Sequence, residues 1–287
     1  MITGAGGQVG GFLAGEATFR GFDVRALTRR DFDITDLSAA ERHIGAGDVV
    51  VNCAALTNVD AAETDPAAAH LINAVGPANL AATCARVGAR LVHISTDYVF
   101  SGNQRRPYEI DDPTGPLSVY GRSKLDGENA VLAALPGAHV VRTSWVYTGG
   151  TGTDFVAVMR RLAATDQTID VVDDQTGAPT YAKDLVSALL EVVAGDIATP
   201  ILHAANDGAV SRFEQARAVF DELGADPDRV RPVSTAEVPR PAHRPEYSVL
   251  SMRDSTRAGL PALRGWREAL TAALAAPVLD GPIASTQ

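Results

Sequence analysis

Cysteine, aromatic residues and positive charge are all scarce in this sequence. Its only two cysteines, Cys53 and Cys84, lie in apolar stretches without the spacing of a zinc or redox motif, so they indicate buried thiols. The formal net charge of −10 argues against nonspecific binding to nucleic acid or to an anionic membrane. No segment reaches the length of a transmembrane helix, and the N-terminus lacks the features of a signal peptide. We therefore expect a cytoplasmic protein with no nucleic-acid or membrane partner.

Hydrophobic residues make up 46% of the 287 residues and charged residues 21%, a balance typical of a soluble globular enzyme with a large core. Short apolar segments alternate with segments of helical periodicity in the first half of the chain. The expected strands span residues 22–28, 48–54, 90–95 and 139–145. Such alternation predicts a parallel sheet with helices on both faces, because parallel strands need crossover connections. The predicted fold class is therefore α/β, a doubly wound sheet of the Rossmann type.

The pattern becomes less regular after residue 145, which predicts a second, smaller substrate-binding lobe. Its region contains helix-like segments at 154–164, 181–194 and 211–223 and a strand-like segment at 168–172. We expect a dinucleotide-binding domain over 1–150, to which segments 173–205 and 240–252 return. The expected lobe comprises 151–172, 206–239 and 253–276, and the Ala-rich tail 277–287 is expected to be disordered.

The first strand is unusually short, because only Met1, Ile2 and Thr3 precede a glycine-rich loop. A central strand normally has five or six residues. Either the sheet begins with a stub, or the recorded start lies downstream of the true one. We favour the second interpretation, which predicts poor stability for the chain as written.

A glycine-rich loop follows this stub, with Gly4, Gly7 and Gly10 in a GxxGxxG pattern. Glycines permit a tight turn and let backbone N–H groups approach a pyrophosphate at a helix N-terminus, here beside Gln8 and Val9. Alone, the pattern is weak evidence, because it also fits an ordinary turn from a strand into a helix. Its position before a chain of α/β units favours a dinucleotide site.

Three polar residues further on indicate acid-base chemistry beside that site. Tyr120 and Lys124 are four residues apart, so on one helix their side chains share a face, and an ammonium there would stabilise a phenolate. Thr96 ends an apolar run, where a buried strand would bring its hydroxyl to the edge of the sheet as a donor for a substrate carbonyl. A YxxxK pattern alone is more often an exposed aromatic beside a solvated lysine. Its occurrence together with the glycine loop makes coincidence improbable.

The end of the second expected strand bears on the choice of nicotinamide cofactor. An acidic residue there would bind the ribose 2′-hydroxyl of NAD, whereas an arginine would accept the 2′-phosphate of NADP. The sequence has Arg29 and Arg30 and no acid at the strand tip, which favours NADPH, although a solvated charge cluster fits these residues equally well.

Seven segments, in order along nearly the whole chain, carry a specific resemblance. They are ITGAGGQVG at 2–10, DITD at 33–36, NCAALTNVDAAE at 52–63, STDYVFSG at 95–102, YGRSK at 120–124, RTSWVY at 142–147 and DDQTGAPTYAKDL at 173–185. With these motifs the chain resembles the extended short-chain dehydrogenases/reductases (extended SDR) and, among them, the dTDP-4-dehydrorhamnose reductases. The resemblance implies reduction of dTDP-4-dehydro-6-deoxy-L-mannose to dTDP-L-rhamnose with NADPH, or with NADH, for cell-envelope polysaccharide.

The resemblance also implies roles for individual residues. Tyr120 would donate the proton to the carbonyl oxygen, Lys124 would hydrogen-bond the nicotinamide ribose, and Thr96 would polarise the carbonyl. The implied cofactor-binding residues are Gly4, Gly7, Gln8, Val9, Gly10, Arg29, Asp33, Ile34, Ala54, Ala55, Leu56, Tyr120 and Lys124. Among them Asp33 and Ile34 would border the adenine.

Substrate contacts are implied for Thr57, Val59, Thr96, Asp97, Tyr98, Trp145 and Arg244. Trp145 fits a sugar contact, with a core aromatic as the alternative. Arg244 could meet the nucleotide diphosphate, and a helix cap or a structural ion pair fits it as well.

The chain departs from the family pattern at two positions. Asp154 stands where an asparagine is common, which puts an amide contact to the nucleotide in doubt, and Leu56 replaces a usual aromatic. Some family members are described as Mg²⁺-linked dimers, but no carboxylate cluster here requires a metal, and we expect a monomer or a homodimer.

Two other functions stay open from the sequence. One is a 4-ketoreductase or epimerase of another nucleotide-deoxysugar. The other is a non-catalytic NADP-binding regulatory subunit, like that of methionine adenosyltransferase, although a binding module has no need for Thr96, Tyr120 and Lys124 together.

Overall fold

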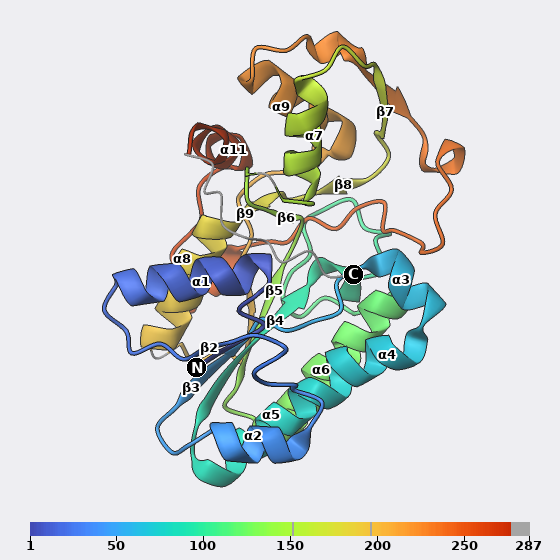
Figure 1. The fold of residues 1–287 in the computed structure, drawn as a ribbon. Coiled ribbons are helices and arrows are strands. Elements are labelled where there is room, and N and C mark those ends of the chain that lie inside the picture. Colours follow the sequence, from blue (N-terminus) through green and yellow to red (C-terminus); the bar gives the residue numbers. More distant parts are fainter. Residues whose placement is uncertain (151, 196, 277–287) are drawn as a thin grey trace.

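A six-stranded parallel sheet forms the centre of the molecule in the computed structural model, which describes residues 1–150, 152–195 and 197–276 (Figure 1). Its strands lie in the order β10-β5-β4-β3-β1-β2, and each neighbouring pair is parallel. Their bounds are β1 Ile2–Thr3, β2 Ala26–Leu27, β3 Val49–Asn52, β4 Arg90–Thr96, β5 His139–Thr143 and β10 Ile201–His203. The chain winds outward from β1 to β2 on one side and from β3 to β10 on the other, so the winding direction reverses between β1 and β3, as in a doubly wound α/β fold.

Helices cover both faces of this sheet and bury two separate apolar layers. One layer contains α2 (Leu37–His43), α5 (Gly76–Val87) and α6 (Val119–Ala134), continued by α3 (Val59–Thr64), α4 (Pro66–His70) and a π-helix at Leu71–Val75. The other contains α1 (Gln8–Phe19) and α8 (Ala182–Ala194), with α10 (Arg253–Arg257) beside β10. The predicted fold class is therefore confirmed.

The remaining elements gather at one end of the molecule around a third apolar cluster (Figure 1). They include α7 (Phe155–Ala163), α9 (Arg212–Glu222) and α11 (Trp266–Ala275). Three short strand pairs accompany them, namely β6 (Val146–Tyr147) with β9 (Thr180–Tyr181), β7 (Ile169–Val172) with β12 (Val230–Val233), and β8 (Thr176–Gly177) with β11 (Val210–Ser211). Single 3-10 turns lie at Asp97–Val99, Pro227–Arg229 and Thr235–Glu237. The division into a nucleotide domain and a substrate lobe stays a prediction, and its tail 277–287 lies outside the described residues.

Two expected strands are shorter than the sequence suggested. The strand expected at 22–28 is reduced to Ala26–Leu27, because Phe22 and the residues after it are largely exposed and lack a neighbouring strand. The strand expected at 139–145 ends at Thr143, because the backbone of Trp145 leaves the extended region with a φ of 48°. This break turns Trp145 out of the sheet at the boundary between the two groups of elements.

Candidate active site at the carboxyl ends of the sheet

The glycine loop leaves no room for side chains where the chain turns from β1 into α1. Gly4 has a φ of 64°, and a Cβ added there would lie 2.6 Å from the backbone nitrogen of Ala54. A Cβ on Gly10 would lie 2.3 Å from the carbonyl oxygen of Gly4. Gly7 is the N-cap of α1 and offers no side-chain hydrogen bond, so the first N–H groups of the helix stay available. Such a cradle suits a phosphate anion.

The loop after β2 is held by its own side chains. Thr28 donates to Asp31 through its backbone N–H at 2.9 Å and its hydroxyl at 2.7 Å. Asp33 accepts from the N–H and the hydroxyl of Thr35, and these hydrogen bonds lower the pKa of Asp33. Arg29 is exposed, and no ion pair joins it to another residue in the described ranges. A free guanidinium at this strand tip could accept a 2′-phosphate.

The segment after β3 is fastened to the helices behind it by Asn73, which lies in the π-helix. The Oδ1 atom of Asn73 accepts the N–H of Leu56 at 2.8 Å, and its Nδ2 atom donates to the Leu56 carbonyl and to Ser123 Oγ. Thr57 follows, exposed, and Val59 begins α3. π-Helical turns are often found at functional sites, and this one places the Asn73 amide against Leu56, one of the predicted cofactor-binding residues. The sequence motifs did not single out Asn73.

Thr96, Asp97 and Tyr120 form one buried polar group at the end of β4. Thr96 Oγ1 donates to Asp97 Oδ1 at 3.0 Å and accepts the N–H of Tyr98 at 3.2 Å. Burial raises the pKa of Tyr120, an effect opposed by a hydrogen bond with Thr96. The rings of Tyr98 and Tyr120 meet edge to face, with centroids 5.7 Å apart. A protonated phenol thus lies beside a hydroxyl, an arrangement suited to delivering a proton to an oxygen between them.

The position of α6 depends on a close approach of its first turn to the loop after β4. Ser118 caps the helix by accepting the N–H of Gly121. A Cβ on Gly121 would lie 2.2 Å from the Tyr98 carbonyl oxygen, so only glycine lets the helix approach this closely. This packing is what holds Tyr120 against Thr96.

Lys124 lies one turn after Tyr120 and is 2% exposed. Its Nζ atom donates to the carbonyl of Ile94 at 2.7 Å and lies 3.3 Å from His93 Nε2. Burial lowers the pKa of Lys124 to about 8, against the opposing effect of Glu128. The two predicted catalytic residues therefore share a helix face, as the spacing indicated, and the ammonium is fixed by the backbone of β4.

Asp97 is almost completely buried, which the sequence did not indicate. Its Oδ2 atom accepts from Ser248 Oγ at 2.5 Å, so a residue 151 positions away completes the group. Burial raises the pKa of Asp97 to about 6, although the hydrogen bonds from Ser248 and Thr96 oppose the shift. Asp97 therefore has its oxygens engaged by protein donors.

Trp145 and Arg244 have partners of their own. The Trp145 ring lies between Gly177 and the guanidinium of Arg212, whose carbon is 3.4 Å from the ring centroid. Arg244 forms a two-point ion pair with Asp60, at 3.1 Å and 2.9 Å. This pairing supports the structural alternative for Arg244, and its contact with a diphosphate stays a prediction.

Asp154, the departure from the family pattern, caps α7. Its Oδ1 atom accepts the N–H of Ala157, and its Oδ2 atom accepts from Thr148 and from Gln8 Nε2, the latter at 3.1 Å. The predicted cofactor loop is thereby tied to the third apolar cluster. Both carboxylate oxygens are thus occupied by protein donors, one of which belongs to the first residue of α1.

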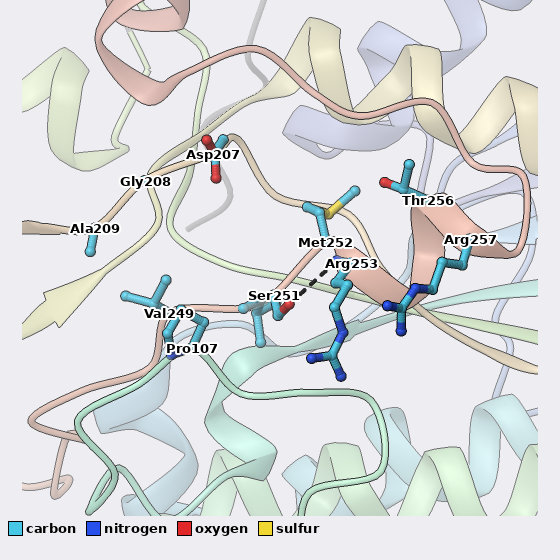
Figure 2. Close-up of a pocket in the computed structure, with 11 residues that line it drawn as sticks. Pro107, Asp207, Gly208, Ala209, Val249, Ser251, Met252, Arg253, Thr256 and Arg257 are labelled. Atoms are coloured by element: carbon cyan, nitrogen blue, oxygen red, sulfur yellow. Dashed lines mark hydrogen bonds between the residues drawn. The ribbon is translucent and has the colours of Figure 1, made fainter.

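A cavity of about 520 Å³ lies elsewhere, lined by residues such as Asp207, Met252, Arg253 and Arg257 (Figure 2). None of the predicted site residues lines it. Its arginines pair with Glu109 and Asp254, so neither of them offers the cavity a free cation. Across the described ranges no three His, Cys, Asp or Glu side chains gather as a metal site, and no helix is long and apolar enough to cross a membrane.

Comparisons with known proteins agree with this geometry. The family model described as the RmlD substrate binding domain matches residues 1–278. The dTDP-4-dehydrorhamnose reductase of Mycobacterium tuberculosis is 62% identical over 281 residues, covering 96% of this chain and 92% of that protein. The structure of the corresponding enzyme of Clostridium acetobutylicum has a TM-score of 0.89 at 39% identity, covering 95% of this chain and 97% of that one.

A third relative is the dTDP-4-dehydrorhamnose reductase of Bacillus anthracis, solved in complex with NADP. It has a TM-score of 0.87 at 36% identity and covers 94% of this chain and 95% of its own. The match extends over both groups of elements, with similarity in sequence as well as fold. The chain belongs to the dTDP-4-dehydrorhamnose reductase family of extended short-chain dehydrogenases/reductases.

Proposed function

We propose that this protein reduces the 4-keto group of dTDP-4-dehydro-6-deoxy-L-mannose to give dTDP-L-rhamnose, with NADPH as the reductant. The observation that carries the proposal is the buried group of Thr96, Tyr120 and Lys124 at the end of β4, in a chain of this family. A regulatory binding module would gain nothing from a buried phenol and ammonium at this place, because burying them costs free energy.

The glycine loop fits a dinucleotide, because Gly4 and Gly10 let the turn pack tightly on neighbouring backbone, while the Gly7 N-cap leaves the first N–H groups of α1 without a side-chain partner. In the proposal its N–H groups hold the pyrophosphate and Arg29 meets the 2′-phosphate. Three residues after β3 cover the dinucleotide, namely Ala54, Ala55 and Leu56. When bound, NADPH supplies the hydride. The bound NADP of the Bacillus anthracis relative supports NADPH, and NADH stays the weaker candidate.

Proton delivery falls to Tyr120 in this mechanism. A phenol is already protonated at neutral pH and burial raises the pKa of Tyr120 further, so it holds a proton to give to the oxygen of the reduced carbonyl. Thr96 steadies that oxygen by donating a hydrogen bond. Lys124 binds the nicotinamide ribose, since its Nζ atom uses one N–H for Ile94 and has others to offer.

The sugar contacts, the location and the assembly belong to the same proposal. Thr57, Val59, Tyr98 and Trp145 would surround the sugar at the ends of the strands. A cytoplasmic location follows from the reaction, because NADPH and nucleotide sugars are metabolites of the cell interior. A monomer or a homodimer fits the chain, and the proposal needs no Mg²⁺ for the chemistry.

The test is NADPH oxidation by the purified protein with enzymatically generated dTDP-4-dehydro-6-deoxy-L-mannose and with a panel of other dTDP- and UDP-4-ketosugars. Selective oxidation with the first sugar is the expected result. Selectivity for another sugar would move the protein to a different deoxysugar while keeping the chemistry. NADPH binding without oxidation of any sugar would favour the regulatory alternative.

A further inference from the structure

The side chain of Trp145 is held rigidly at the boundary between the sheet and the third apolar cluster. Trp145 is the one non-glycine residue with positive φ in the described ranges. A Cβ on Gly177 would lie 2.4 Å from the indole Cε2 atom, so the glycine backbone packs directly on the ring. A bulky residue in the left-handed region carries strain, and such strain is concentrated at functional sites.

Arg212 covers this indole with its guanidinium. It is the first residue of α9, after the Ser211 N-cap, and its guanidinium carbon lies 3.4 Å from the Trp145 ring centroid and 4.8 Å from that of Phe155. Stacking on two aromatic rings fixes the orientation of the planar group. The guanidinium is therefore placed in advance of any ligand.

Arg212 also lacks a carboxylate partner. Its one recorded side-chain hydrogen bond runs from Nη1 to Gln215 Oε1 at 3.2 Å, and no ion pair involves it within residues 1–150, 152–195 and 197–276. Arg244 and Arg264, by contrast, are paired with Asp60 and Asp184. A guanidinium has five N–H donors, so most of those on Arg212 remain unused.

The charge of Arg212 acts on the substrate side of the site. After burial, which has the largest effect on its pKa, interactions with Tyr98 and with the Asp97 carboxylate raise the pKa of Arg212 and the charge of Arg244 lowers it, so Arg212 lies within electrostatic range of these three residues. Burial, the largest effect, lowers the pKa of Arg212 to about 10, which still leaves it protonated at neutral pH. A partly buried guanidinium without a directly paired carboxylate costs free energy and suits a place that receives an anion.

Given the proposed function, we propose that Arg212 binds the diphosphate of the nucleotide-sugar substrate. The diphosphate is the anionic part of that substrate, and a guanidinium binds it by charge-assisted, two-point hydrogen bonds. Arg244 is less suited, because Asp60 already neutralises it. Because it is stacked on Trp145, the Arg212 guanidinium is already oriented before the ligand binds, which reduces the entropy lost on binding.

The test measures binding of dTDP alone by calorimetry, which needs no turnover. Arg212→Met should weaken dTDP binding about 10- to 100-fold, as expected for loss of charge-assisted hydrogen bonds. Arg212→Lys keeps the charge without the fork and should fall between. NADPH affinity should be unchanged in both variants, which also shows that they fold. In steady-state assays the loss should appear mainly in KM for the sugar nucleotide.

The matched control is Arg217→Met on the same helix. Arg217 also lies over an aromatic ring, that of Phe213, but it pairs with Asp228 and is expected to leave dTDP binding unchanged. Unchanged dTDP affinity in Arg212→Met, with normal reduction of the sugar, would overturn the assignment and leave the proposed function standing. A wild-type protein that binds dTDP through Arg212 but reduces no 4-ketosugar would overturn the function alone.

Discussion

Replacing Lys124 with methionine should stabilise the cofactor-free protein at neutral pH while it disables the proposed catalyst. The ammonium is buried and has one recorded acceptor, the carbonyl of Ile94. Its other neighbour, His93 Nε2, lies 3.3 Å away. The free-energy cost of burying the ammonium depends on whether His93 Nε2 accepts or donates a hydrogen bond. The hydrogen bonds of Asn52 determine which of the two it does.

A chain of buried hydrogen bonds sets the tautomer of His93. Asn52 Oδ1 accepts the N–H of Ala54, which can only donate, and the hydroxyl of Thr3. The Nδ2 atom of Asn52 must therefore donate to His93 Nδ1, 3.0 Å away. The imidazole proton is then on Nε2, facing Lys124. Burial and the Lys124 charge both lower the pKa of His93 well below its usual value, so the ring stays neutral and opposes the ammonium.

The magnitude follows from the pKa of Lys124, which falls from 10.5 to about 8. At about 1.4 kcal/mol per unit, the charged lysine costs the folded state about 3 kcal/mol. Methionine removes this cost but leaves the Ile94 carbonyl without its partner, a loss of about 1 kcal/mol. The expected net gain is about 2 kcal/mol, which for a chain of this size raises Tm by roughly 5 °C.

The dependence on pH makes the test specific. For a lysine whose folded pKa is lowered, the cost is complete below pH of about 8 and fades as the pH rises towards 10.5, where the unfolded chain also loses the proton. The advantage of Lys124→Met, measured by thermal unfolding without cofactor, should shrink over that interval. Lys183→Met, at an exposed position of α8, is the control and should shift stability by less than about 0.5 kcal/mol. The reasoning would be refuted if Lys124→Met were less stable than the wild type at neutral pH, or if its gain in stability did not change with pH.

Three further substitutions test other parts of the site. Tyr120→Phe should abolish NADPH oxidation and leave NADPH affinity within about twofold, because it removes the proton donor alone. Normal turnover in this variant would show that Tyr120 is not the proton donor. Gly10→Ala should weaken NADPH binding and lower the free energy of unfolding by about 1–3 kcal/mol, since its Cβ would lie 2.3 Å from a carbonyl oxygen. Its control is Gly15→Ala in the same helix, whose Cβ meets no atom within 4 Å and which should not lower stability. Asp154→Asn should lower the free energy of unfolding by about 2 kcal/mol, because an amide has one acceptor oxygen where the carboxylate has two. Chemical denaturation measures the change, with the exposed helix-cap variant Asp36→Asn as a control that should leave stability nearly unchanged.

Much of the fold could be predicted because its signals are local. Strand β4 is a run of apolar residues that ends in Thr96, and the hydroxyl at its tip is where the pattern placed it. The four-residue spacing of Tyr120 and Lys124 fixes their common face on α6 in the same way. Period and spacing along one segment suffice for such predictions.

The parts of the site that sequence reasoning missed depend on distant pairings. Ser248 reaches Asp97 across 151 positions, and Asp60 neutralises Arg244 across 184, so neither partner is visible in a local pattern. Arg212 looks like an ordinary first-turn residue of a helix until the strand break at Trp145 brings an indole beneath it. No local signal marks that break, because tryptophan is common in strands and the apolar run predicted a strand through residue 145.

The single proton of the Thr96 hydroxyl limits how this site can bind a carbonyl. In the structure that proton is directed to Asp97 Oδ1, while the oxygen accepts from Tyr98 N–H. To donate to a substrate oxygen, Thr96 must give up the bond to an ionised Asp97, or Asp97 must carry a proton and donate in its turn. Because burial raises the pKa of Asp97 to about 6, the protonated form lies only about 1.4 kcal/mol above the ionised one at a pH one unit higher. The proposed polarisation of the carbonyl by Thr96 is therefore tied to the protonation state of its neighbour, and in that proposal Asp97 would act on the reaction through Thr96.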